Sequence, residues 1–179
     1  RIVMIEPRSV LAQGVAYATT HGEHLLNVPA ARMSAFDDRP EDFLDYVVAT
    51  TPPGGPERAS LAHAFIERRR YGEYLRVRLA EAIAASPAQL QVVHDRVAEL
   101  EPRSDGATLR LARHGELQAA GVVLAVGNTP KPLPARGAPQ LPEGRSLAAW
   151  DFDAVKAIPR DADLCIVGSG LSMVDTVLS

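Results

Sequence analysis

Two short apolar runs, each followed at once by residues of distinctive chemistry, constrain the fold of this chain most strongly. Ile2 to Ile5 precede Glu6 and Pro7, and Leu164 to Val167 precede Gly168-Ser169-Gly170. A four-residue apolar run bounded by turn-forming residues is typical of a strand buried on both faces of a parallel sheet. The sequence therefore predicts an α/β fold with a buried strand in each of these two places.

Glu6 stands where an acidic residue commonly binds a nucleotide. At the end of a strand in a dinucleotide-binding unit, such a residue accepts hydrogen bonds from the ribose hydroxyls. A glycine-rich loop lies about twenty residues before it, and we expect that loop upstream of Arg1. The chain starts inside an apolar run and stops within a predicted helix, so we expect a fragment truncated at both ends. The alternative is that Glu6 only ends a strand.

The string from Gly168 to Met173 is a second candidate nucleotide site. A Gly-x-Gly turn between a strand and a helix lets the backbone approach a pyrophosphate, whose charge the helix N-terminus favours. Met173 replaces the usual third glycine of this motif. The alternative is a purely structural turn from strand to helix.

The order of these two motifs is informative. Within one dinucleotide-binding unit the glycine loop precedes the acidic residue, whereas here Glu6 precedes Gly168 by most of the chain. The simplest account is two units, the end of one at Glu6 and the start of another at Gly168. An enzyme that binds two dinucleotides has this arrangement.

Local patterns predict the elements between the two motifs. Asp38 is expected to cap a helix with Pro40 in its first turn, and the proline- and glycine-rich residues 51–56 should end that helix. Asp105-Gly106 predicts a turn between short strands. The remaining predicted elements are one or two helices over 61–85, strands over 90–100, 108–111 and 117–126, and a proline-rich connector over 129–142.

Composition excludes several classes of protein. The net charge of −3 provides no general basic field for nucleic acid, and no apolar run is long enough to cross a membrane. Cys165 is the only cysteine, which rules out an internal disulfide and favours a cytoplasmic protein. Within its predicted strand, Cys165 is expected to be a small buried residue. Abundant arginine and alanine, with only two lysines, favour a bacterial source.

Other polar groups carry weaker signals. His21 and His24 lack further ligands nearby in the sequence, so we expect no metal site. The basic run 68–70 could meet a nucleotide phosphate, but the solvated face of a helix is favoured. Trp150 and Asp151 are expected only to pack and to cap a helix.

Six strings occur in order along the chain: Ile5-Glu6-Pro7, Gly14-Val15-Ala16-Tyr17, Leu25-Leu26-Asn27-Val28-Pro29-Ala30, Tyr71-Gly72-Glu73-Tyr74-Leu75, Leu124-Ala125-Val126-Gly127-Asn128 and Gly168-Ser169-Gly170-Leu171-Ser172-Met173-Val174-Asp175. Together they resemble a bacterial family of FAD/NAD(P)-binding proteins. That family is distantly similar to flavin-dependent N-hydroxylating monooxygenases and to glutathione-reductase-type flavoproteins. The resemblance covers nearly the whole chain.

The resemblance implies roles for particular residues. Glu6 would hold the adenosine ribose of FAD, and Val97 would meet the adenine through its backbone. The other implied FAD contacts are Gly14, Val15, Tyr17, Asn27, Ala125, Gly127 and Asn128, and the implied NAD(P) contacts are Gly168, Gly170 and Ser172. A redox-active cysteine pair after Glu6 is missing, which excludes a disulfide reductase within this region.

The expected fold is therefore α/β and Rossmann-like, with a mainly parallel sheet and a small β-hairpin element. Residues 1–135 would form a FAD-binding domain without its first glycine loop, and 136–179 a crossover and the start of an NAD(P)-binding unit. The expected function is a FAD-dependent oxidoreductase that takes electrons from NAD(P)H and acts on a small molecule. The alternatives are a non-catalytic nucleotide-binding module, a truncated remnant of such a flavoprotein, or a scaffold domain. No catalytic residue stands out.

Overall fold

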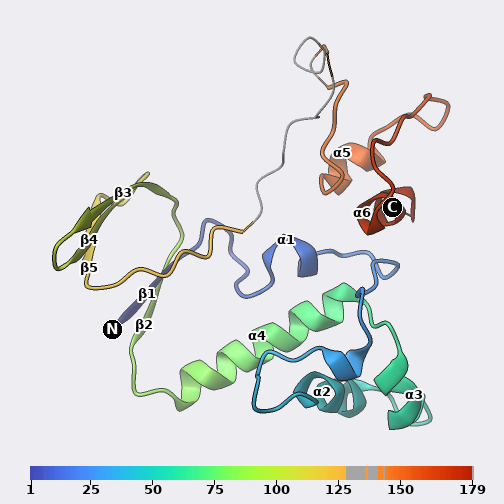
Figure 1. Ribbon diagram of the computed structural model, residues 1–179, viewed down its shortest axis with the longest axis horizontal. Coiled ribbons are helices and arrows are strands. Elements are labelled where there is room, and N and C mark those ends of the chain that lie inside the picture. Colours follow the sequence, from blue (N-terminus) through green and yellow to red (C-terminus); the bar gives the residue numbers. More distant parts are fainter. Residues whose placement is uncertain (128–135, 137–140, 143, 179) are drawn as a thin grey trace. The chain divides into compact units, whose positions relative to one another are not determined.

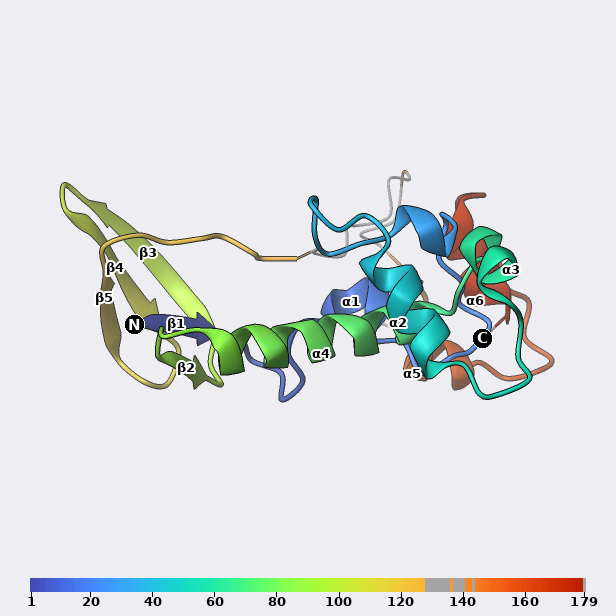
Figure 2. The same ribbon diagram turned by 90° about the horizontal axis from the view of Figure 1, so that it is seen from below.

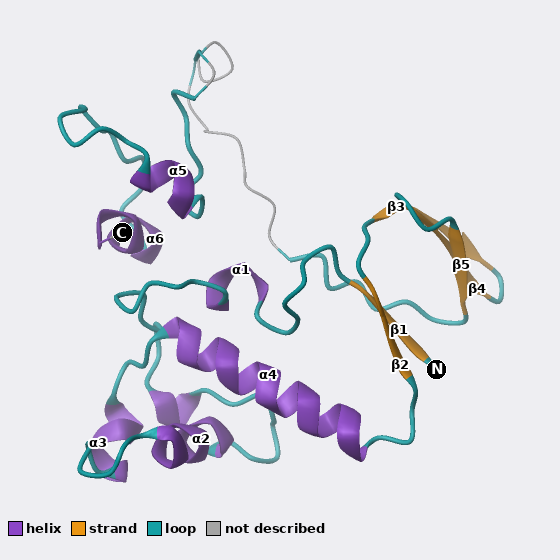
Figure 3. Ribbon diagram, turned by 180° about the vertical axis from the view of Figure 1, so that it is seen from behind, coloured by secondary structure: helices purple, strands orange, loops and turns teal. Residues whose placement is uncertain are grey.

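The computed structural model describes residues 1–127, 136, 141–142 and 144–178, which fall into two compact units. The first unit consists of Arg1–Gly14 and Glu73–Gly127. The second consists of Val15–Gly72 and the described residues of Asn128–Ser179. All the named strands belong to the first unit, whereas the second is built from helices and loops (Figure 3).

A parallel pair of strands contains the first predicted strand. β1 (Ile2–Ile5) runs parallel to β2 (Leu90–Val93), with Ile2 opposite Leu90 and Ile5 opposite Val93 (Figure 1). The prediction of a strand over residues 2–5 is confirmed. Because the strands are parallel, the residues that follow them, Glu6 and His94, lie at the same edge of the sheet.

An antiparallel sheet of three strands completes the strands of the first unit. β3 (Val97–Arg103), β4 (Gly106–Leu111) and β5 (Glu116–Ala119) are ordered β3-β4-β5, and the predicted turn at Asp105-Gly106 joins the first two. One expectation was wrong: residues 90–100 are two strands, interrupted at 94–96. The cause is local: the Asp95 carboxylate accepts the backbone N–H of Arg96 at 2.7 Å, and this hydrogen bond competes with the pairing of a continuous strand.

The predicted helical region 61–85 contains two helices. α3 (Arg58–His63) and α4 (Arg68–Ala85) are separate, and α4 is the long continuous helix in Figure 2. It ends just before Ser86-Pro87, where the proline ring disfavours helical geometry at the preceding residue. Tyr74 of α4 is completely buried.

In the second unit, η1 (Ala30–Arg32), α2 (Asp42–Thr50) and α3 pack together. Short α1 (Gly14–Tyr17) precedes them along the chain. Apolar side chains form the core of this unit: Leu26, Ala30, Phe43, Leu44, Val47, Leu61, Ile66 and Tyr71. The helix expected after Asp38 exists, but its N-cap residue is Glu41, so the cap assignment to Asp38 was wrong. Proline is tolerated just before a helix as well as in its first turn, so Pro40 does not fix the residue at which the helix begins.

Two short helices lie in the second unit near the end of the chain. α5 (Phe152–Lys156) begins after Asp151, whose carboxylate accepts the N–H of Ala154 at 3.1 Å, as the predicted cap requires. α6 (Leu171–Leu178) follows the Gly168-Ser169-Gly170 turn, so the predicted helix after this turn is confirmed.

Two predicted strand segments differ from expectation. Residues 121–127 and 164–167 are not strands, and Val123 and Val167 are 93% and 65% exposed. Cys165 is also exposed, which corrects its expected burial. The reason is physical: an apolar run becomes a strand only if another segment pairs with its backbone, and no described segment pairs with these two.

The α/β class therefore holds, whereas the mainly parallel Rossmann-like sheet does not appear among the described residues. There the parallel sheet has two strands and the antiparallel sheet has three. Most of the predicted connector over 129–142 lies outside the described residues. Of the helices that the structure describes, none is both long and apolar enough to cross a membrane.

Candidate functional site

The carboxyl edge of the β1–β2 pair presents Glu6 together with two basic residues. The Glu6 carboxylate accepts the backbone N–H of Arg8 at 3.0 Å and its Nε at 3.2 Å, both on Oε1. The imidazole Nδ1 of His94 lies 3.3 Å from the carbonyl oxygen of Glu6 and 3.1 Å from that of Arg8. This histidine thus ties the turn after β1 to the end of β2.

The electrostatics of the edge keep Glu6 ionised at neutral pH. Partial burial raises the pKa of Glu6, but the backbone and side-chain hydrogen bonds from Arg8, with the charges of Arg8 and His94, outweigh burial and lower the pKa. No described residue donates a hydrogen bond to Oε2. Glu6 therefore presents a charged acceptor oxygen to whatever binds at this edge.

Asp95, which the sequence did not single out, organises the loop beside this edge. Its carboxylate is 1% exposed, and accepts the backbone N–H groups of Arg113 and His114 at 3.0 Å each and the His114 imidazole at 2.7 Å. The β4–β5 turn is thereby clamped onto the segment between β2 and β3. One signal in the sequence could have identified Asp95: it lies within a predicted strand, and aspartate is depleted from strands.

The remaining predicted contacts in the first unit occupy irregular or edge positions. Val97 is half-buried at the start of β3, directly after the Asp95 loop. Gly14, Ala125 and Gly127 are exposed, and Gly127 has a positive φ of 69° that favours glycine. Among the described residues, no hydrogen bond or ion pair joins Val97, Gly14, Ala125 or Gly127 to Glu6, and Asn128 lies outside the described residues.

Three predicted FAD contacts lie in the second unit. Val15 is 45% exposed and Asn27 is exposed, whereas Tyr17 is half-buried with its ring 4.8 Å from that of Tyr71 in an edge-to-face arrangement. This packing gives Tyr17 a structural role whatever it binds.

The predicted NAD(P) loop leads directly into α6. Gly168 has a φ of +116°, and a Cβ at Gly168 or Gly170 would meet open space. Within the described part of the chain, the backbone N–H groups of Gly170, Leu171 and Ser172 find no acceptor. Unpaired N–H groups at a helix start are the donors that an anionic group can use.

The second unit contains a buried polar network that the sequence did not predict. Arg68 Nη1 lies 2.7 Å from Asp175 Oδ2, and both side chains are about nine-tenths buried. His24 is fully buried, with Nδ1 2.7 Å from Thr19 Oγ1 and Nε2 3.2 Å from the carbonyl oxygen of Asp175. The basic run 68–70 is therefore not simply a solvated face: Arg69 is exposed, but Arg68 is not.

Two features of the chain, the acidic residue at the carboxyl edge of a parallel strand pair and the glycine turn leading into α6, are those of an α/β nucleotide-binding protein. A model of the family described as FAD-NAD(P)-binding matches residues 1–129, and the chain belongs to this family. No curated protein and no solved structure matched the chain.

Proposed function

We propose that this protein is a FAD-dependent oxidoreductase that takes electrons from NAD(P)H, and that Glu6 binds the adenosine ribose of FAD. The observation that carries the proposal is the free, ionised Oε2 of Glu6 at the carboxyl edge of β1 and β2, in a chain of the FAD-NAD(P)-binding family. Ligands of open α/β sheets bind outside the carboxyl ends of the strands.

The hydrogen-bonding groups at this edge suit a ribose. A carboxylate is an acceptor only, and the two ribose hydroxyls are donors, so Oε2 can accept from them while Oε1 stays with Arg8. His94 holds the turn through backbone carbonyl oxygens, which keeps the carboxylate in place. We assign Val97 to the adenine, and Gly14, Val15, Tyr17, Asn27, Ala125, Gly127 and Asn128 to the rest of the FAD.

The loop Gly168–Ser172 is the proposed NAD(P) contact. The N–H groups at the start of α6 would donate to the pyrophosphate, and the absent side chains of Gly168 and Gly170 leave room for the ligand to approach. Residues 1–135 would then serve FAD and residues 136–179 would begin the nicotinamide unit. When bound, FAD supplies the redox chemistry, and the residues of this chain bind and orient it.

The direct test is to measure flavin binding by the purified natural protein. We expect flavin absorption after reconstitution with FAD, and oxidation of NADH or NADPH in air. Glu6→Gln should weaken FAD binding by about ten- to a hundredfold, the equivalent of the ~1.5–3 kcal/mol of a hydrogen bond to a charged group. Glu101→Gln, an exposed glutamate on β3, is the matched control and should bind FAD normally.

Three results would separate the alternatives. No flavin binding and no NAD(P)H oxidation would refute the proposal. Tight nucleotide binding without turnover would favour a non-catalytic module. Normal FAD affinity in Glu6→Gln would leave a flavoprotein but remove Glu6 from its site.

A further inference from the structure

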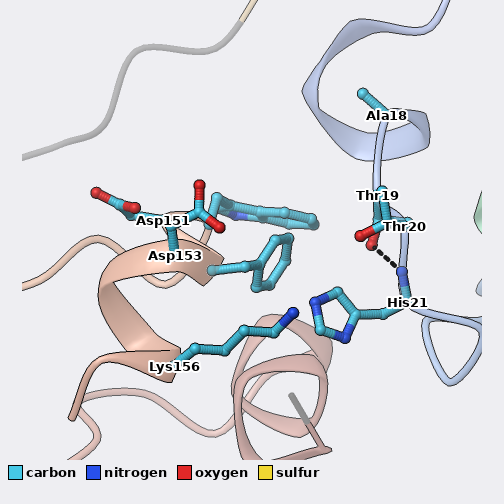
Figure 4. Close-up of a pocket in the computed structure, with 9 residues that line it drawn as sticks. Ala18, Thr19, Thr20, His21, Asp151, Asp153 and Lys156 are labelled. Carbon is cyan, nitrogen blue, oxygen red and sulfur yellow. Dashed lines mark hydrogen bonds between the residues drawn. The ribbon is translucent and has the colours of Figure 1, made fainter.

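An open pocket of about 270 Å³ lies in the second unit, and none of the residues that line it was assigned above to a nucleotide. Its walls come from residues 18–21 on one side and from residues 150–153 with Lys156 on the other (Figure 4). Small-molecule pockets usually start at ~300 Å³, so this one is too small for a dinucleotide and suits a single ring with a small substituent.

Hydrogen bonds hold both walls in place. Thr19 Oγ1 lies 2.7 Å from Nδ1 of the fully buried His24, and it accepts the backbone N–H of His21 at 3.2 Å. On the other wall, the Asp151 carboxylate caps α5. Such support means that a ligand meets groups already in position, which lowers the entropic cost of binding.

Flat aromatic surfaces line the pocket. The Phe152 ring lies 5.2 Å from the His21 imidazole and 6.0 Å from the Trp150 indole, measured between ring centroids. The His21 ring stacks on His24 at 4.9 Å. Rings at these distances leave faces and edges against which another planar ring can pack.

One end of the pocket is cationic. Figure 4 shows the side chain of Lys156 extending toward His21, with Asp151 and Asp153 on the far side of the pocket from His21. No ion pair joins Lys156 to a described carboxylate. Burial first, and then the charges of Lys156 and His24, lower the pKa of His21, so its imidazole is neutral at neutral pH and the ammonium is the charge at this end.

We propose that this pocket is a binding site for a small aromatic carboxylate, whose ring packs against Phe152 and Trp150 and whose carboxylate pairs with Lys156. An ammonium that pairs with no described carboxylate favours an anion, and the aromatic walls favour a planar ring over an aliphatic acid. The assignment is independent of flavin binding, because the pocket contains none of the proposed FAD or NAD(P) contacts.

The chain itself provides the probe. Trp150 is the only tryptophan in the sequence and lines the pocket, so its fluorescence reports on occupancy directly. The 179-residue chain would be titrated with benzoate, with benzamide, which keeps the ring but not the charge, and with cyclohexanecarboxylate, which keeps the charge but not the flat ring. We expect a saturable change with benzoate and at least about tenfold weaker binding of the other two, the factor that ~1.4 kcal/mol represents.

Variants test the residues. Lys156→Gln should weaken benzoate binding about tenfold or more, as loss of a charge-assisted contact requires. Lys156→Arg keeps the positive charge and should retain binding, which would show that the site tolerates substitution. Arg160→Gln removes a nearby exposed cation that does not line the pocket, and should bind as the unmodified chain does.

Other outcomes overturn the proposal. Equal affinity for benzamide would show a neutral aromatic site, and equal affinity for cyclohexanecarboxylate would show a simple anion site. A non-saturable fluorescence change, or unchanged benzoate affinity in a folded Lys156→Gln variant, would also exclude it. Circular dichroism of each variant establishes that it is folded.

Discussion

Arg68 and Asp175 form a buried ion pair with 2.7 Å between Nη1 and Oδ2, although 107 positions separate them in the sequence. Arg68 Nε also donates to the carbonyl oxygen of Leu25 at 2.8 Å. His24 Nε2 lies 3.2 Å from the backbone carbonyl oxygen of Asp175. These contacts join the start of α4, the loop around His24 and α6 within the second unit.

Breaking this pair by changing one partner should be costly. Arg68→Met or Asp175→Asn alone should lower the free energy of unfolding by about 3–5 kcal/mol, because each leaves a buried polar group without its partner. The double variant should lose much less than the sum of the two, which urea unfolding followed by circular dichroism can measure.

The exposed pair of Arg58 with Asp45 is the matched control. Their atoms lie 2.5 Å apart, yet the two side chains are 45% and 61% exposed. Water screens such a pair, so the corresponding Arg58→Met and Asp45→Asn variants should change stability far less. Additive effects at Arg68 and Asp175 would contradict the coupling inferred here.

Asp95 should make the stability of the first unit depend on acid pH. Burial raises the pKa of Asp95, but hydrogen bonds from the His114 ring and from the backbone of Arg96, Arg113 and His114 outweigh burial and bring the pKa well below its ordinary value of 3.8. A carboxyl whose folded pKa is lowered stabilises the fold above its ordinary pKa. That stabilisation is lost as the pH falls below 3.8 and through the folded value.

Asp95→Asn should therefore be less stable at neutral pH and should show a flatter decline of stability in acid. Urea unfolding at a series of pH values measures both effects. Asp105→Asn replaces an 87% exposed aspartate in the β3–β4 turn and should preserve the unmodified profile. Parallel acid profiles for Asp95→Asn and the unmodified chain would show that Asp95 is not the titrating group.

Gly106 should be far less tolerant of alanine than Gly115, although both are in β-turn regions of the same sheet. A Cβ at Gly106 would lie 2.1 Å from the carbonyl oxygen of Ala119, a backbone atom of β5. At Gly115 the Cβ would meet nothing within 4 Å, and only its φ of +76° opposes substitution.

We expect Gly115→Ala to cost about 1–2 kcal/mol, the strain of left-handed backbone for a residue with a side chain. Gly106→Ala should cost about 1–3 kcal/mol more, because β4 and β5 must separate to admit the methyl group. Thermal unfolding and hydrogen exchange of the β5 amides measure the two effects. Similar losses in both variants would mean that β5 moves freely.

Local patterns in the sequence determined those elements that depend on neighbouring residues. The apolar run before Glu6 predicted β1, the proline and glycine residues at 51–56 predicted the end of α2, and Asp105-Gly106 predicted the turn before β4. The predicted helix after Gly170 is confirmed as α6. Each of these features depends on turn chemistry or side-chain periodicity within a few residues, which sequence reports directly.

Only the tertiary structure decided which distant groups meet. The sequence placed residues 122–126 and 164–167 in strands, because an apolar run has the same appearance whether or not a partner strand exists. It likewise treated Arg68 as part of a solvated run and gave Asp95 no role. Buried Arg68 pairs with Asp175, and buried Asp95 accepts a hydrogen bond from His114. Both contacts form only when the chain brings distant segments together.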